Sequence, residues 1–204
     1  MKKLVSVVVP FYNEVDNVFP LAERVEAVFV GLDDYEYECL FVNDGSTDGT
    51  RQALENLRAR DSHVRPVHLT ANRGQSAALV AGMRRAKGEY ILTLDGDLQN
   101  DPQDFPKILN LLEEYDCVCG YRANRRDTLV RRISSKVANA VRGRLLGDGI
   151  RDSGCGTKGF RRVCVQHMVP FNGLNRLWRG IYDLIGVAWL KRRYVAFTVE
   201  GEDE

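Results

Sequence analysis

Residues 90–101 read YILTLDGDLQND, a short apolar run that ends in three aspartates within seven positions. The run does not alternate between apolar and polar residues, which is typical of a strand buried on both faces of a parallel sheet. Side chains directly after such a strand lie at the carboxyl edge of the sheet, where open α/β folds bind their ligands. The stretch therefore predicts an α/β fold with an acidic ligand site at that edge.

Four further apolar runs predict strands, and helices are expected between them. The expected strands cover residues 4–10, 37–42, 64–70 and 116–121, in addition to 89–94. Helical spacing and capping residues predict helices over 15–29, from Ser46, Thr47 or Asp48 to about Arg60, over 76–88 with Gly88 closing the helix, and over 101–115. Alternation of this kind calls for right-handed crossovers and a mainly parallel sheet covered on both faces.

Polar segments follow four of these strands. They are PFYNE (10–14), NDGS (43–46), TANRG (70–74) and DGDLQ (95–99). Because the carboxyl ends of parallel strands meet at one edge, these segments are expected to form a single site.

Composition limits the class of protein. The 204 residues suit one globular domain with an appendage, and the net charge of +1 gives no global field for nucleic acid. Five cysteines without a CxxC pair favour neither a zinc site nor a disulfide framework, and indicate a reducing cytosol. The apolar run at residues 4–10 is too short for a signal peptide, and LIGVAWL (184–190) is too short to span a bilayer. Membrane contact, if any, is expected to be peripheral.

The DGDLQ segment has the residues of a divalent metal site. Gly96 allows the carboxylates of Asp95 and Asp97 to approach one cation, and Gln99 offers a neutral oxygen. Mg²⁺ and Mn²⁺ prefer such ligands and commonly bridge a carboxylate to substrate phosphates. The alternative is a solvated Asp-Gly turn.

Asp44 is the corresponding candidate after the second strand. An acidic residue at a strand end can accept hydrogen bonds from a nucleoside, although NDGSTDGT also fits ordinary turn chemistry. No GxGxxG follows the first strand, which argues against an ordinary NAD fold.

The chain becomes strongly basic after Tyr121. Arg122, Arg125, Arg126 and Arg132 are candidates for binding a phosphate, because guanidinium groups match phosphate oxygens; the alternative is a solvated basic face. Residues 129–145 and 174–193 combine apolar side chains with arginines, as interfacial helices do, although packing in a homo-oligomer or against the core would give the same pattern.

The motifs together resemble those of family 2 glycosyltransferases, most closely the polyprenyl-phosphate type that includes dolichyl-phosphate mannosyltransferase. The resemblance rests, in order, on VVVPFYNE, FVNDGSTDGT, NRGQSAALVAGMRRAKGEYILTLDGDLQNDP, GYRANRRD and RDSGCGTKGFRR, and covers about residues 4–170. It implies a GT-A (Rossmann-like) fold, a nucleotide-sugar donor (UDP- or GDP-sugar), inversion at the anomeric carbon and a polyprenyl phosphate acceptor.

The resemblance also implies roles for single residues. Pro10, Tyr12, Glu14 and Asp44 would line the nucleoside pocket, Asp95 would help to place the donor, and Asp97 with Gln99 would hold Mg²⁺ or Mn²⁺. Among the arginines it selects Arg122 and Arg132 for the acceptor. A phosphate acceptor is already anionic at pH 7 and requires no strong base. Asp152 either caps a turn or closes the site as a carboxylate near the acceptor.

The expected organisation is a GT-A domain over residues 1–170 and an amphipathic, membrane-proximal helical segment over 171–204. The family's basic acceptor-side loop is missing near 173–174, either by deletion or, as we prefer, because the sequence omits a mobile segment. We expect an enzyme at the cytoplasmic face of the membrane. The alternatives are a transferase to a soluble sugar hydroxyl, for which Asp152 would be the base, and a non-catalytic nucleotide-sugar-binding scaffold.

Overall fold

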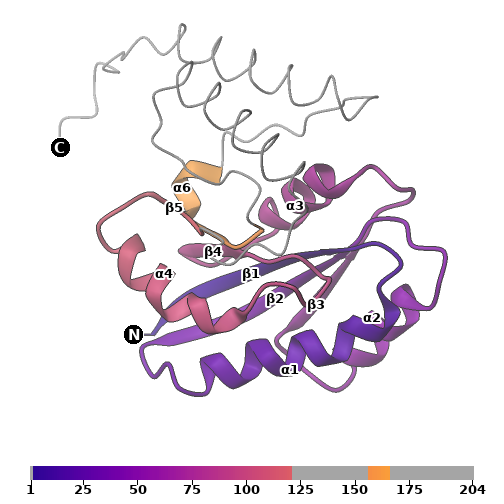
Figure 1. Ribbon diagram of the computed structural model, residues 1–204, viewed down its shortest axis with the longest axis horizontal. Coiled ribbons are helices and arrows are strands. Elements are labelled where there is room, and N and C mark those ends of the chain that lie inside the picture. The colour runs from indigo at the N-terminus through magenta and orange to yellow at the C-terminus, as the bar shows by residue number, and fades with distance from the viewer. Residues whose placement is uncertain (1, 121–155, 166–204) are drawn as a thin grey trace, which may run out of the picture. The chain divides into compact units, whose positions relative to one another are not determined.

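A computed structural model describes residues 2–120 and 156–165, which belong to one compact unit made of Met1–Gly120 and Gly154–Phe171. Within these residues one sheet has the strand order β3-β2-β1-β4-β6-β5 (Figure 1). The strands are β1 (Lys3–Phe11), β2 (Tyr35–Asn43), β3 (Val64–His68), β4 (Tyr90–Thr93), β5 (Cys117–Cys119) and β6 (Lys158–Arg161). The helices are η1 (Val15–Asn17), α1 (Val18–Phe29), α2 (Thr50–Arg58), α3 (Gln75–Met83), η2 (Pro102–Asp104), α4 (Phe105–Leu112) and α6 (Arg162–Val165).

The first four strands are parallel to one another, and the predicted α/β fold with a mainly parallel, helix-flanked sheet is confirmed. Successive strand residues point to opposite faces, so Val7 and Val9 of β1 pack under α1, α2 and α4, whereas Val8 packs with α3 and α6. Both faces are therefore apolar, which explains the continuous runs in the sequence.

The strands beyond β4 in the strand order were only partly predicted. The expected strand at 116–121 is present as β5, but β6 lies between it and β4 and is antiparallel to both. The KGFR sequence of β6 has no apolar run and was not predicted as a strand. The backbone N–H of Gly120 donates to the carbonyl of Thr157 at 2.9 Å, so the chain leaves β5 and returns to β6 at neighbouring points.

The prediction for α3 was wrong at its end. The helix stops at Met83, and Gly88 does not close it. A Cβ on Gly88 would lie 2.6 Å from the backbone nitrogen of Ser6, so this glycine allows the turn before β4 to pack against β1. The helix expected over 15–29 begins as the 3-10 turn η1.

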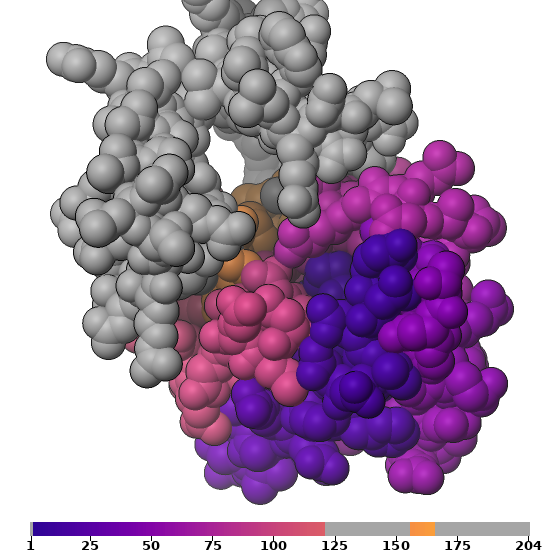
Figure 2. Space-filling view, turned by 45° about the vertical axis from the view of Figure 1, so that its right-hand side comes forward, coloured from indigo at the N-terminus to yellow at the C-terminus, as the bar shows by residue number. Residues whose placement is uncertain are grey.

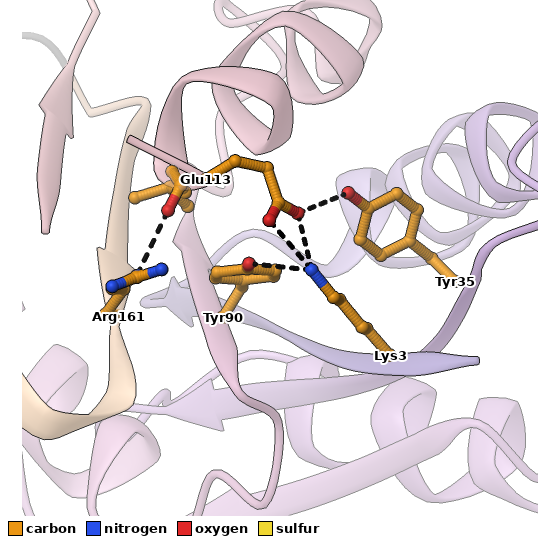
Figure 3. A network of polar contacts seen from close by, with 6 residues as sticks. Lys3, Tyr35, Tyr90, Glu113 and Arg161 are labelled. Carbon is orange, nitrogen blue, oxygen red and sulfur yellow. Dashed lines mark hydrogen bonds and ion pairs between the residues drawn. The ribbon is translucent and has the colours of Figure 1, made fainter. Parts of the chain in front are cut away.

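A polar network ties the amino ends of the strands to the end of α4 (Figure 3). Lys3 Nζ lies 2.7 Å from Glu113 Oε1 and 3.3 Å from the Tyr90 hydroxyl, and the Tyr35 hydroxyl donates to Glu113 at 3.4 Å. The bond to Glu113 raises the pKa of Lys3, and the same bond lowers the pKa of Glu113. Both side chains are about 40% exposed (39% and 43%), so this is a surface contact.

The predicted boundary at residue 170, the loop near 173–174 and the amphipathic segments lie outside the described residues. In the part of the chain that is described, no helix has both the length and the apolar character required to cross a bilayer.

Candidate active site

The four polar segments meet at the carboxyl edge of the sheet. Phe11 at the end of β1 lies opposite Asn43 of β2, which lies opposite His68 of β3, while Thr93 of β4 pairs with Val8. Figure 2 turns this side of the molecule toward the viewer, and indigo, magenta and pink segments that are far apart in the sequence meet on it.

Asp44 is buried and anchors the segment that precedes α3. Its side chain accepts hydrogen bonds from the backbone N–H groups of Arg73 at 2.7 Å and Gly74 at 2.8 Å. Gly45 has φ 68°, and a Cβ there would lie 2.4 Å from the nitrogen of Asn72. The loops after β2 and β3 are therefore in backbone contact, and only glycine fits between them.

The segment after β1 is fixed to the same loop. Asn13 has φ 56°, its side chain accepts from the N–H of Thr47 at 2.8 Å, and its own N–H donates to Ser46 Oγ at 3.0 Å. This places Tyr12, which is 47% exposed, and the half-buried Glu14 beside the Asp44 loop. A Cβ on Gly96 would lie 2.8 Å from the buried Pro10's carbonyl, which links this segment to DGDLQ.

Asp48 sets the start of α2. It accepts from the N–H and hydroxyl of Thr50 at 2.9 and 2.5 Å, and from the N–H of Val15 at 3.2 Å. Burial raises the pKa of Asp48, but the bonds from Thr50 and Val15 outweigh it and the net shift is downward. The N-cap position itself is Gly49, one residue after the three predicted candidates.

Asp95 and Asp97 have different surroundings although only Gly96 separates them. The half-buried Asp95 accepts from Gln75 Nε2 at 2.6 Å and from Asn100 Nδ2 at 3.1 Å. Asp97 is exposed, and its Oδ1 accepts from the backbone N–H of Gln99 at 3.1 Å. The turn therefore directs one carboxylate toward the protein and the other toward solvent.

The donors present fit a hard divalent cation. Asp97 and Gln99 supply exposed oxygen ligands next to each other, the type that Mg²⁺ and Mn²⁺ prefer. No group of three or more His, Cys, Asp and Glu side chains within residues 2–120 and 156–165 is arranged to hold a metal ion. Mg²⁺ is commonly bound by one or two carboxylates together with substrate phosphates.

The remaining predicted site residues are Arg122, Arg125, Arg126, Arg132 and Asp152, which lie outside the described residues. Sequence reasoning missed Gln75 and Asn100, which contact Asp95 directly. Their position beside strand-end motifs was the available signal, because Gln75 follows NRG and Asn100 follows DGDLQ.

Comparison with known proteins identifies the family. The model described as glycosyl transferase family 2 matches residues 6–169. The chain belongs to glycosyl transferase family 2.

Curated relatives of this family 2 chain include polyprenyl-phosphate sugar transferases. Dodecaprenyl-phosphate galacturonate synthase of Rhizobium johnstonii is 41% identical over 175 residues, which are 84% of this chain and 52% of the relative. Undecaprenyl-phosphate 4-deoxy-4-formamido-L-arabinose transferase of Klebsiella pneumoniae is 39% identical over 169 residues, which are 82% and 51%. The chain thus spans about half the length of these relatives (52% and 51%).

Solved structures of glycosyltransferases share the fold. A mannosyltransferase of Pyrobaculum calidifontis, in complex with GDP-Man and Mn²⁺, gives a TM-score of 0.60 at 22% identity, covering 84% of this chain and 48% of that one. Glucosyl-3-phosphoglycerate synthase of Mycobacterium tuberculosis, in complex with Mn²⁺, UDP-Glc and phosphoglyceric acid, gives 0.59 at 22% identity, covering 79% and 57%. This likeness confirms the predicted GT-A fold of the family 2 chain.

Proposed function

We propose that this family 2 chain contains the donor site of an inverting, metal-dependent enzyme that transfers a sugar from a UDP- or GDP-sugar to a polyprenyl phosphate. The observation that carries the proposal is the convergence of Asp44, Asp95 and Asp97 at one edge of a parallel sheet. The relatives support this choice of acceptor, because their names contain dodecaprenyl phosphate and undecaprenyl phosphate.

The donor would be held by residues from three strand ends. Pro10, Tyr12, Glu14 and Asp44 would contact the nucleoside. Asp95 would help to position the donor, and Asp97 and Gln99 would hold Mg²⁺ or Mn²⁺ against the diphosphate. When bound, the ion neutralises the charge that develops on the departing nucleoside diphosphate.

The acceptor requires cations rather than a base. Its phosphate is already ionised, so the protein must hold two anions near each other. Arg122 and Arg132, with Arg125 and Arg126, are the proposed phosphate ligands because guanidinium groups form paired hydrogen bonds with phosphate oxygens. Asp152 would close the site near the acceptor.

The proposed place of action is the cytoplasmic face of a membrane. The basic, apolar segments 129–145 and 174–193 would contact the lipid surface through their apolar side chains and arginines. The alternative is that these segments form a homo-oligomer. Size measurements with and without lipid would distinguish this from membrane binding.

The test is transfer of radiolabelled sugar from a panel of UDP- and GDP-sugars to a short polyprenyl phosphate, with Mn²⁺ or with EDTA. We expect metal-dependent transfer that Asp97→Ala reduces by about 10²–10³-fold, the scale seen when a group that stabilises transition-state charge is removed. Asp104→Ala, an exposed aspartate beside α4, is the matched control and should retain full activity.

Three outcomes would contradict the proposal. Transfer that persists in EDTA and in Asp97→Ala would exclude the metal role. Transfer to a soluble sugar but to no polyprenyl phosphate, with loss in Asp152→Asn, would favour the hydroxyl-acceptor enzyme. Nucleotide binding without transfer to either acceptor would indicate a non-catalytic scaffold.

A further inference from the structure

The carboxylate of Asp95 is held by two side-chain amides from different parts of the chain. Gln75, the first residue of α3, donates to Oδ1 at 2.6 Å, and Asn100, in the turn after β4, donates to Oδ2 at 3.1 Å. Bonds from two directions restrict rotation of the carboxylate more than one bond would. A hydrogen bond to a charged group also contributes more than one between neutral groups.

The amide of Gln75 is carried on backbone that is itself fixed. Asp44 binds the N–H groups of the two preceding residues, Arg73 and Gly74. The side chain of Gln75 then reaches the end of β4. The contact therefore connects the loop proposed to bind the nucleoside with the first carboxylate of the DGD motif.

Backbone also packs against Asp95. A Cβ on Gly156 would lie 2.0 Å from Asp95 Oδ2, so the carboxylate packs directly against this glycine. The carbonyl of Gly156 accepts from Thr93 Oγ1 at 2.8 Å, which holds the glycine against the end of β4. Asp95 is thus restricted by Gln75, Asn100 and Gly156 together.

We propose that Gln75 and Asn100 are positioning residues that aim the Asp95 carboxylate at the donor. The inference rests on the proposed function. The inference gives the two aspartates different roles. Asp95 would be an oriented hydrogen-bond acceptor for the donor, and Asp97 would be a ligand of the metal. A neutral amide is the suitable partner because it donates without adding a charge beside the cation site.

The test compares Gln75→Ala, Gln75→Glu and Asn100→Ala with the wild-type chain. Calorimetry measures binding of UDP and GDP in the presence of Mn²⁺, and the transfer assay gives KM and kcat for donor and acceptor separately. We expect each alanine variant to weaken Mn²⁺-dependent nucleotide binding and to raise the donor KM by about tenfold, equivalent to about 1.4 kcal/mol. The KM for the acceptor and the Mn²⁺ concentration for half-maximal activity should change less than twofold.

Gln75→Glu distinguishes hydrogen bonding from packing. Glutamate keeps the shape of glutamine but places a second carboxylate beside Asp95, so we expect a larger loss of donor binding than in Gln75→Ala. A purely structural role would make glutamate the milder substitution. Gln52→Ala is the matched control, because Gln52 donates its amide to Asn56 at 3.0 Å on the exposed side of α2.

A double-variant experiment completes the test. In an Asp95→Asn background, Gln75→Ala should add less than a twofold effect, because the acceptor that it orients has been changed. Equal losses for donor and acceptor, or unchanged donor binding in Gln75→Glu, would overturn the inference while leaving the proposed function in place. A wild-type chain that neither binds UDP or GDP with Mn²⁺ nor transfers sugar would overturn both.

Discussion

Glu38 shows how a single buried carboxylate can organise a sheet. It lies on β2, is 7% exposed, and accepts from Ser6 Oγ and the N–H of Lys87 at 2.7 Å each, as well as from Arg65. Ser6 Oγ in turn accepts from the N–H of Gly88 at 2.8 Å. The network connects β1, β2, β3 and the turn before β4.

The network makes stability depend on pH. Burial raises the pKa of Glu38, but the bonds from Lys87, Ser6 and Arg65 together lower it below the ordinary value of 4.5. Because the pKa of Glu38 is lower in the folded state, ionised Glu38 stabilises the fold above pH 4.5. This stabilisation is lost as the pH falls through the folded-state pKa of Glu38.

Glu38→Gln should therefore reduce the free energy of unfolding by about 1–3 kcal/mol at pH 7, since it removes the charge from three hydrogen bonds. The difference from wild type should shrink below pH 4.5. Urea unfolding from pH 3 to pH 7 measures both effects. Glu36→Gln, an exposed carboxylate two residues earlier on the same face of β2, is the control; an equal loss there would show that burial of Glu38 is not the cause.

At the scale of elements, the candidate site depends on contacts between two loops. The loop after β2 meets the loop after β3 where Gly45 faces Ala71 and Asn72. A side chain at Gly45 would separate these loops and would move the backbone N–H groups that Asp44 binds.

Gly45→Ala should therefore lower stability by about 1–3 kcal/mol through backbone strain and should also weaken Mn²⁺-dependent nucleotide binding. Gly31→Ala is the matched control, because the nearest atom to its Cβ would be Val28's carbonyl oxygen at 3.7 Å. Thermal unfolding and calorimetry of both variants provide the measurement. Nucleotide binding that survives in folded Gly45→Ala would show that the loop contact is unnecessary for the site.

The same scale shows what the sequence could predict. Buried strands such as β1 and β4 were predictable because their apolar runs record burial on both faces. Strand β6 was not, because its KGFR sequence joins the sheet through hydrogen bonds to strands remote in the chain. The end of α3 was mispredicted because Gly88 serves close packing against β1, and a glycine before a strand looks the same in either role.

The aspartates of the candidate site could be predicted from the sequence, but the groups that donate hydrogen bonds to them could not. Asp44, Asp95 and Asp97 stand at strand ends, a position that sequence pattern reveals. The partners of Asp44 are backbone N–H groups of Arg73 and Gly74, which any residue but proline would supply, so no residue type marks them.

Across the whole described unit, the carboxyl ends and the amino ends of the strands carry different groups of polar side chains. The carboxyl edge carries the donor-site candidates, and the amino edge carries the Lys3–Glu113 network (Figure 3). Lys3→Met should change Mn²⁺-dependent nucleotide binding by less than twofold. Its effect on the thermal midpoint should be small and should disappear in high salt, because an exposed ion pair is screened.

The control for this prediction is Lys2→Met, an exposed neighbour. Thermal scans at low and high salt, with calorimetry on the same samples, make the comparison. A clear loss of nucleotide binding in Lys3→Met alone would show that the two edges are coupled through the strands.

The bond between Gly120 and Thr157 has a consequence for how such a protein can diversify. Because the chain departs and re-enters at adjacent points of the sheet edge, residues 121–155 occupy an insertion point whose two ends are already joined by the fold. A segment of different length or chemistry could be exchanged there without altering the strand order that holds Asp44, Asp95 and Asp97. Chimaeras spliced at these two residues would therefore test whether the described unit keeps its fold when residues 121–155 are replaced by the corresponding segment of a relative.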